Sequence, residues 1–119
     1  MENRQITKNF SAKELMCKCG CEELHIDQAF IEKLQTLRDL CGFPLVVSSY
    51  YRCSKHPEEA KKEQPGYHNK GQAVDIIKPQ GERAYILLAN AIKLGFTGIG
   101  VSNKFIHLDI RPIGAVWGY

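Results

Sequence analysis

Long apolar runs are missing from this chain of 119 residues. Polar residues interrupt the longest stretches, such as residues 84–89, well before the roughly 20 apolar residues that a membrane-spanning helix needs. The first residues, Met1 to Arg4, do not lead into the apolar region of a secretory signal. We therefore expect no transmembrane segment and no signal peptide, and a protein that is cytoplasmic or is released from the cytoplasm.

Charge of one sign is not concentrated anywhere in the sequence. The net charge is only +3, and the basic residues are scattered, without the basic-aromatic stripe that is typical of nucleic-acid binding. Nucleic acid is therefore not an expected partner. A weak positive charge is compatible with weak attraction to an anionic polymer.

The composition is that of an ordinary globular domain, with 44% hydrophobic and 24% charged residues and no repeat or low-complexity tract. The length is right for one compact domain over residues 1–119, with one core and one site. We expect a monomer. The five cysteines are an odd number, so they cannot all pair within one chain.

Local signals predict helices first and then strands mixed with one more helix. Ser11 and Glu14 have capping-box spacing and predict a short helix over 11–16. Asp27 and Gly42 can begin and end a second helix, and a third is expected over 82–94. Strands are expected over 45–49, 71–77, 98–101 and 105–110, with irregular chain between residues 53 and 66. The predicted class is α+β, with a small antiparallel sheet flanked by helices.

Two histidines and an aspartate have the chemistry of a metal site. His68 and Asp75 lie seven positions apart across a glycine, and His107 comes from a predicted strand. Two nitrogens and one oxygen suit zinc with an open fourth position, the arrangement of a catalytic site. Asp109 lies two residues beyond His107, so both side chains are expected on the same face of the strand.

Several ordered motifs resemble a known family. They are His-x-x-Gly-x-Ala-x-Asp at 68–75, His-x-Asp at 107–109, the stretch Ser49 to Cys53, and Gly-Phe-x-Gly-Ile-Gly at 95–100. From about residue 10 onward, the chain resembles the zinc D-alanyl-D-alanine carboxypeptidases and related cell-wall endopeptidases, which share the fold of the hedgehog signalling domain. Within this group it is most similar to a short, phage endolysin-like branch.

The resemblance implies a zinc peptidase that hydrolyses bacterial peptidoglycan stem peptides and is released to the cell wall. It implies zinc ligation by His68, Asp75 and His107, and it gives Arg52 the role of stabilising the substrate carbonyl or the oxyanion. The sequence departs from the family at two positions. Gly66 replaces the usual serine, and Lys104 replaces the carboxylate that several relatives carry three positions before the last histidine.

Asp109 is the nearest substitute for the missing carboxylate. It is expected to be the general base, if it can reach the reacting water. The alternative is that Asp109 orients a ligand imidazole from behind. Without a base, the chain would be a zinc-stabilised binding module that has lost catalysis.

The cysteines at 17, 19 and 21 have gaps tighter than those of paired zinc ligands, and no second pair follows at finger-like spacing. Relatives often carry cysteines here and at the position of Cys53, which favours a local disulfide or packed thiols over a metal site. A weaker alternative makes this cluster the centre of a redox or metal sensor. Trp117 is expected in the core.

Overall fold

The chain begins with two helices, and strands mixed with further helices follow. The computed structural model describes residues 3–60 and 66–119. The helices are α1 (Ala12–Leu15), α2 (Gln28–Cys41), α3 (Pro57–Ala60), the 3-10 helix η1 (His68–Lys70) and α4 (Gly81–Leu94). The strands are β1 (Val47–Ser49), β2 (Ala73–Ile77), β3 (Gly98–Val101), β4 (Phe105–Asp109) and β5 (Ala115–Gly118).

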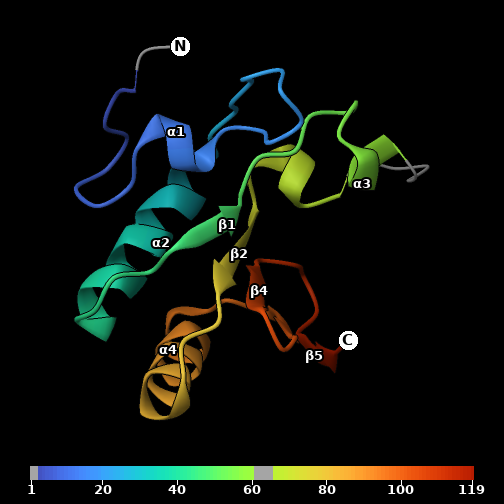
Figure 1. Ribbon diagram of the computed structural model, residues 1–119. Helices are drawn as coiled ribbons and strands as arrows, with labels where there is room; N and C mark the ends of the chain where they lie inside the picture. The colour runs from blue at the N-terminus through green and yellow to red at the C-terminus, as the bar shows by residue number, and fades with distance from the viewer. Residues whose placement is uncertain (1–2, 61–65) are drawn as a thin grey trace.

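The five strands form one sheet in the order β1-β2-β4-β3-β5 (Figure 1). This confirms the α+β class, but the sheet is mixed rather than wholly antiparallel, because β5 runs parallel to β3. The reason is the path of the chain after β4. That strand ends with Asp109 beside Gly98, at the start of β3, and the next strand then begins on the other side of Gly98, at Ala115. Strands that leave from the same end of the sheet must run in the same direction.

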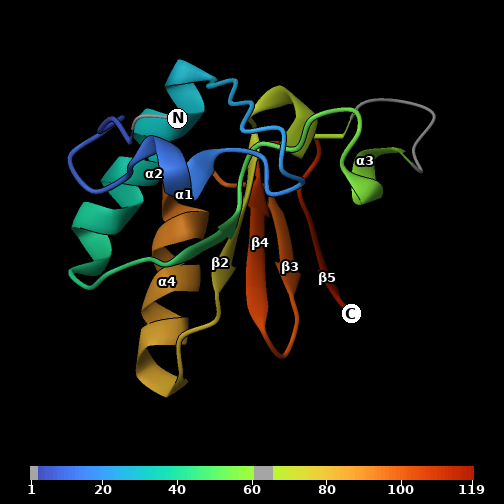
Figure 2. The same cartoon turned by 45° about the horizontal axis from the view of Figure 1, so that its top comes forward.

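The core lies between the helices and one face of the sheet. Both views show α2 and α4 on the same side of the strands (Figures 1 and 2). The Asp27 carboxylate accepts from the amide of Phe30 at 2.9 Å and begins α2, and Gly42 ends it with a φ of 72°. The buried residues that these elements share include Ile31, Leu34, Leu37, Val74, Ile76, Leu87, Ala91, Ile106 and Leu108.

The opposite face of the sheet carries polar residues. Since Val74, Ile76, Ile106 and Leu108 enter the core, the residues that alternate with them point to the other side. The strand register aligns one residue from each strand into a row across this face: Ser49, Asp75, His107, Gly100 and Trp117. We call this row the site row.

Three elements were not predicted from the sequence: α3, η1 and β5. Trp117 is half-buried on the site row rather than in the core, so its predicted placement is wrong. Strand β5 lies at the edge of the sheet, and apart from Trp117 its side chains are exposed. None of the helices in the described ranges has the length and apolar character to cross a membrane.

Candidate metal centre

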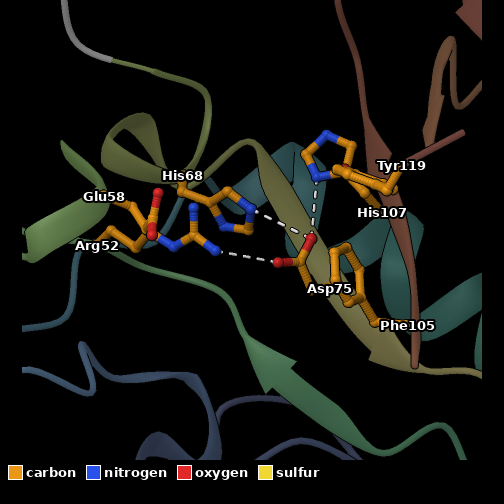
Figure 3. A pocket seen from close by; sticks show the side chains of 7 residues that line it. All are labelled: Arg52, Glu58, His68, Asp75, Phe105, His107 and Tyr119. Atoms are coloured by element: carbon orange, nitrogen blue, oxygen red, sulfur yellow. Dashed lines mark hydrogen bonds and ion pairs between the residues drawn. The ribbon is translucent and has the colours of Figure 1, made fainter. Parts of the chain in front are cut away.

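The three predicted ligands come together on the polar face of the sheet (Figure 3). One ligand atom from each of His68, Asp75 and His107 lies within 4.8 Å of the other two. All three side chains are buried. They come from three elements, η1, β2 and β4, that the sheet and its neighbouring loop hold in place.

Asp75 is at the centre of this group. Its Oδ1 lies 2.9 Å from Nδ1 of His107 and 3.3 Å from Nε2 of His68, so one oxygen faces both rings. Its Oδ2 accepts from Nη2 of Arg52 at 3.0 Å. Burial opposes ionisation of this carboxyl, but the contacts with His107 and His68 outweigh burial and hold its pKa well below the usual range. Asp75 is therefore a carboxylate.

The tautomer of His68 follows from its partner. Its Nδ1 lies 2.7 Å from the backbone carbonyl oxygen of Tyr50. A carbonyl can only accept, so Nδ1 carries the proton and the lone pair of the neutral ring is on Nε2. That Nε2 is buried and has no hydrogen-bond partner within residues 3–60 and 66–119.

His107 is oriented in the same way by a carboxylate. Its Nε2 donates to Oδ2 of Asp109 at 2.7 Å, and its Nδ1 lies 2.9 Å from Oδ1 of Asp75, so Nδ1 is the nitrogen that offers a lone pair to the site when the ring is neutral. Burial disfavours the charged ring, but the bonds to Asp109 and Asp75 outweigh it and raise the pKa of His107.

The electrostatics of the three atoms call for a cation between them. When both rings are neutral, the lone pairs of His68 Nε2 and His107 Nδ1 converge on the negatively charged Oδ1 of Asp75. Without a positive charge, these three atoms repel one another. A proton or a metal ion can supply that charge, and the donor set of two nitrogens and one oxygen fits zinc.

Arg52 is held next to the group. Besides its bond to Asp75, its Nε donates to Ser49 Oγ at 3.1 Å, and its backbone N–H donates to the carbonyl of His68 at 3.2 Å. The Asn69 side chain donates to the Arg52 carbonyl at 2.8 Å. The segment of Arg52 and helix η1 therefore support each other.

Asp109 lies behind His107 rather than in the pocket. It is fully buried, and its carboxylate also accepts from the backbone N–H and from Nε of Arg111 at 3.0 and 2.9 Å. Burial raises the pKa of Asp109, but the bonds to His107 and Arg111 outweigh it, so the net shift is downward. This geometry favours the orienting role of Asp109 over that of a base.

Sequence reasoning missed Arg111. Its position two residues after Asp109 is a usable signal, because residues two apart in extended chain share a face. Its guanidinium also lies over the Trp117 ring, 4.4 Å from the ring centroid.

A pocket of about 420 Å³ opens over the candidate ligands. Its lining comprises Arg52, Glu58, His68, Asp75, Phe105, His107 and Tyr119. Two of these residues, Glu58 and Phe105, were not predicted. Phe105 lies two residues before His107 in β4 and could have been found from that spacing, whereas Glu58 reaches the pocket only through the tertiary fold. Lys104 is exposed.

Comparisons with known proteins identify the family of the chain. No curated protein matches the sequence. The family model described as Peptidase M15 matches residues 8–109, a range that contains all three candidate ligands, Arg52 and Asp109. Because this match covers most of the chain, the protein belongs to the peptidase M15 family.

Proposed function

We propose that this protein is a zinc metallopeptidase in which His68 Nε2, Asp75 Oδ1 and His107 Nδ1 hold the metal. One observation supports this most directly. His68 Nε2 and His107 Nδ1 face a single carboxylate oxygen in a buried site, and the partners of the other two ring nitrogens hold both rings in place. Zinc, when bound there, would supply a Lewis acid that polarises a scissile carbonyl and lowers the pKa of water.

Arg52 has the chemistry to stabilise the oxyanion. A guanidinium keeps its positive charge at every working pH and offers several directional donors. The bonds to Asp75 and Ser49 fix it at the wall of the pocket, which removes the cost of ordering a long side chain when substrate arrives. We assign it to the carbonyl oxygen of the bond that is cut.

Asp109 is assigned as a positioning residue. Its carboxylate fixes the tautomer and the ring plane of His107, and Arg111 fixes the carboxylate in turn. Such a partner raises the basicity of a ligand imidazole without touching the substrate. Its full burial behind the ring supports this assignment.

Glu58 is assigned as the general base. Apart from Asp75, it is the pocket-lining carboxylate in the described part of the chain, and its side chain is directed toward Arg52 and His68 (Figure 3). A base must come within hydrogen-bond reach of the proton that it accepts, so a residue on the pocket wall meets the first requirement. The carboxylate that relatives carry at the position of Lys104 is thus replaced from a different element, α3.

The proposed substrate is a peptidoglycan stem peptide. The family resemblance supports this substrate class. The pocket has a permanent cation, Arg52, on one side and the rings of Phe105 and Tyr119 on the other, which suits a peptide with both charged and apolar parts.

Incubation with purified muropeptides tests the proposal. With zinc present we expect new products, and mass spectrometry of these products identifies the bond, either a terminal D-alanine or a bond within the stem. A chelator should stop product formation, and added zinc should restore it. Zinc binding without any product would show instead a binding module that retains the ligands, and no zinc binding at the three residues would reject the proposed metal centre.

A further inference from the structure

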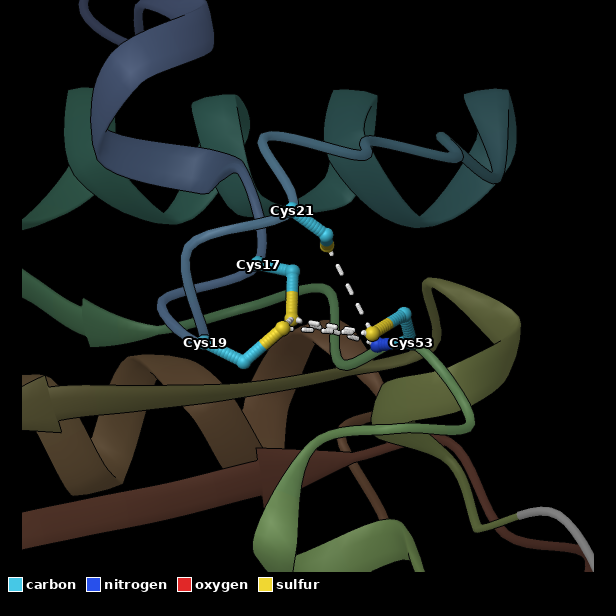
Figure 4. Close-up of side chains that lie close together, drawn as sticks. All are labelled: Cys17, Cys19, Cys21 and Cys53. Carbon is cyan, nitrogen blue, oxygen red and sulfur yellow. Dashed lines mark hydrogen bonds between the residues drawn. The ribbon is translucent and has the colours of Figure 1, made fainter.

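A second group of metal-ligating side chains lies outside the pocket. Cys17, Cys19 and Cys21 come from the loop after α1, and Cys53 comes from the segment after β1 (Figure 4). The Cys53 sulfur lies 3.6 Å from that of Cys17, 3.4 Å from that of Cys19 and 3.5 Å from that of Cys21. All four sulfurs lie within 4.8 Å of one another. We call these residues the thiol cluster.

A disulfide does not account for the thiol cluster. All five cysteines, including the distant Cys41, are free thiols. A disulfide joins two sulfurs and leaves the other two without a reason to converge on the same point. Four ligands at about 2.3 Å from a tetrahedral zinc ion, by contrast, stand about 3.8 Å apart. Four of the six sulfur pairs are separated by 3.4 to 3.6 Å, close to that spacing, and the other two pairs lie within 4.8 Å.

The local backbone is arranged to bring the sulfurs together. In an extended chain, the first and last of three alternate residues stand roughly 13 Å apart, too far for short cysteine side chains to reach one ion. Here residues 18–21 form a turn, and Gly20 and Glu22 have φ values of 104° and 58°. The left-handed region is unfavourable for a non-glycine residue, so neighbouring structure must hold Glu22 there.

Backbone amides point at two of the sulfurs. The N–H of Cys53 donates to Sγ of Cys17 at 3.3 Å, and the N–H of Glu23 donates to Sγ of Cys21 at 3.4 Å. Amide donors of this kind stabilise thiolates, and they form the outer shell around sulfur ligands in metal sites. The amide of Cys17 also donates to the carbonyl of Glu23 at 2.8 Å, which closes the loop.

From these contacts we propose a second metal site, in which Cys17, Cys19, Cys21 and Cys53 bind Zn²⁺ as four thiolates. Four protein ligands leave no open position, so the site is structural and not catalytic. The position of Cys53 in the chain suggests what this metal site would stabilise. Cys53 directly follows Arg52, and a metal at the thiol cluster would therefore fasten the segment of the pocket arginine to the N-terminal loop.

Zinc counting separates the two sites. Protein purified under reducing conditions should hold about two zinc ions per chain, and the H68A variant about one. The double variant C19S/C21S should also hold about one, because the exposed positions of these two thiols allow the change without disturbing the core. C41S is the matched control, since its thiol lies outside the cluster, and it should keep both ions.

Cobalt gives a second readout, the absorption spectrum of the bound ion. Co²⁺ added to the metal-free H68A protein should produce the strong near-ultraviolet absorption of thiolate-to-cobalt charge transfer. C19S/C21S should lack this absorption while its far-ultraviolet circular dichroism matches that of C41S. An H68A protein without the thiolate band would overturn the proposal. So would a native mass that has lost two hydrogens for each of one or two disulfides within the cluster.

Discussion

Asp75 and His107 are direct cross-strand neighbours in β2 and β4, with Oδ1 of the carboxylate 2.9 Å from Nδ1 of the imidazole. Residues that face each other across an antiparallel pair have their Cβ atoms about 4.5 to 5.5 Å apart. This separation is set by the backbone hydrogen bonds of the sheet. Two of the three candidate ligands therefore owe their spacing to strand pairing, and only His68 comes from outside the sheet.

Loss of His68 should abolish zinc binding at the pocket. Even outer-shell changes cost about 10 to 100-fold in metal affinity, so the H68A change should cost more. Titration with a competing chelator measures this, using the C19S/C21S background so that only one site is read. H25A, which removes an exposed histidine, is the control. Unchanged affinity in H68A would remove His68 from the ligand set.

Replacing Asp109 with asparagine tests its positioning role. Because D109N keeps the size but loses the charge behind His107, zinc affinity should fall about 10 to 100-fold. Turnover at saturating zinc should then recover to within about 10-fold of the unchanged protein. D39N, a change at an exposed residue of α2, is the control. A large loss of turnover with zinc affinity intact would instead make Asp109 the base.

Glu58 should be needed for turnover but not for zinc binding. General-base catalysis contributes about 10² to 10⁴-fold, so E58Q should lower kcat by at least about 100-fold with zinc content unchanged. The assay measures release of product from muropeptides. E32Q, at an exposed position of α2, is the control and should keep full activity. Full activity of E58Q would exclude Glu58 as the base.

Gly98 should tolerate no side chain. A Cβ built at this position would lie 1.9 Å from Oδ1 of Asp109, so G98A must push the buried carboxylate away from His107. We expect a loss of about 1 to 3 kcal/mol in the free energy of unfolding and weaker zinc binding. Urea denaturation measures the first effect. G114A is the matched control, because its Cβ would meet only the Thr97 carbonyl, at 3.6 Å. Equal stability of the two variants would contradict the packing described for Asp109.

The Tyr50 hydroxyl should contribute to stability. It is fully buried, donates to the Gly71 carbonyl at 2.7 Å and accepts from the amide of Asp27 at 3.3 Å. Burial raises its pKa to about 12, so the donor keeps its proton across the working range. Y50F leaves both partners unsatisfied and should cost about 1 to 3 kcal/mol in thermal or urea unfolding. Y85F, at an exposed tyrosine, should cost nothing measurable.

The features that local chemistry determines were predicted best from the sequence. The second helix begins after Asp27 and ends before Gly42, because a side-chain cap and a left-handed glycine act within one turn of the chain. Strand β3 has the predicted bounds, 98–101. The three candidate ligands and Arg52 were singled out by residue type and motif, and the structure brings them together, although their binding of zinc stays a prediction.

What the sequence did not predict depends on tertiary structure. Strand β5 is short and exposed, so it lacks the alternation that marks a half-buried strand, and its pairing depends on where β4 ends. Glu58 belongs to a four-residue helix that carries no periodic signal. The position of Asp109 behind the His107 ring, rather than beside the open pocket, depends on Gly98, which strand pairing alone brings next to the carboxylate.

The three candidate ligands are held in two different ways: two of them by the sheet, and the third by a short helix. Asp75 and His107 are locked by the strand ladder, whereas His68 depends on η1 and on the carbonyl of Tyr50. If zinc binds here as proposed, its entry and exit need not disturb the sheet and would depend on the short helix η1. The rate of metal exchange should therefore follow the local opening of residues 68–70, far faster than unfolding of the whole domain.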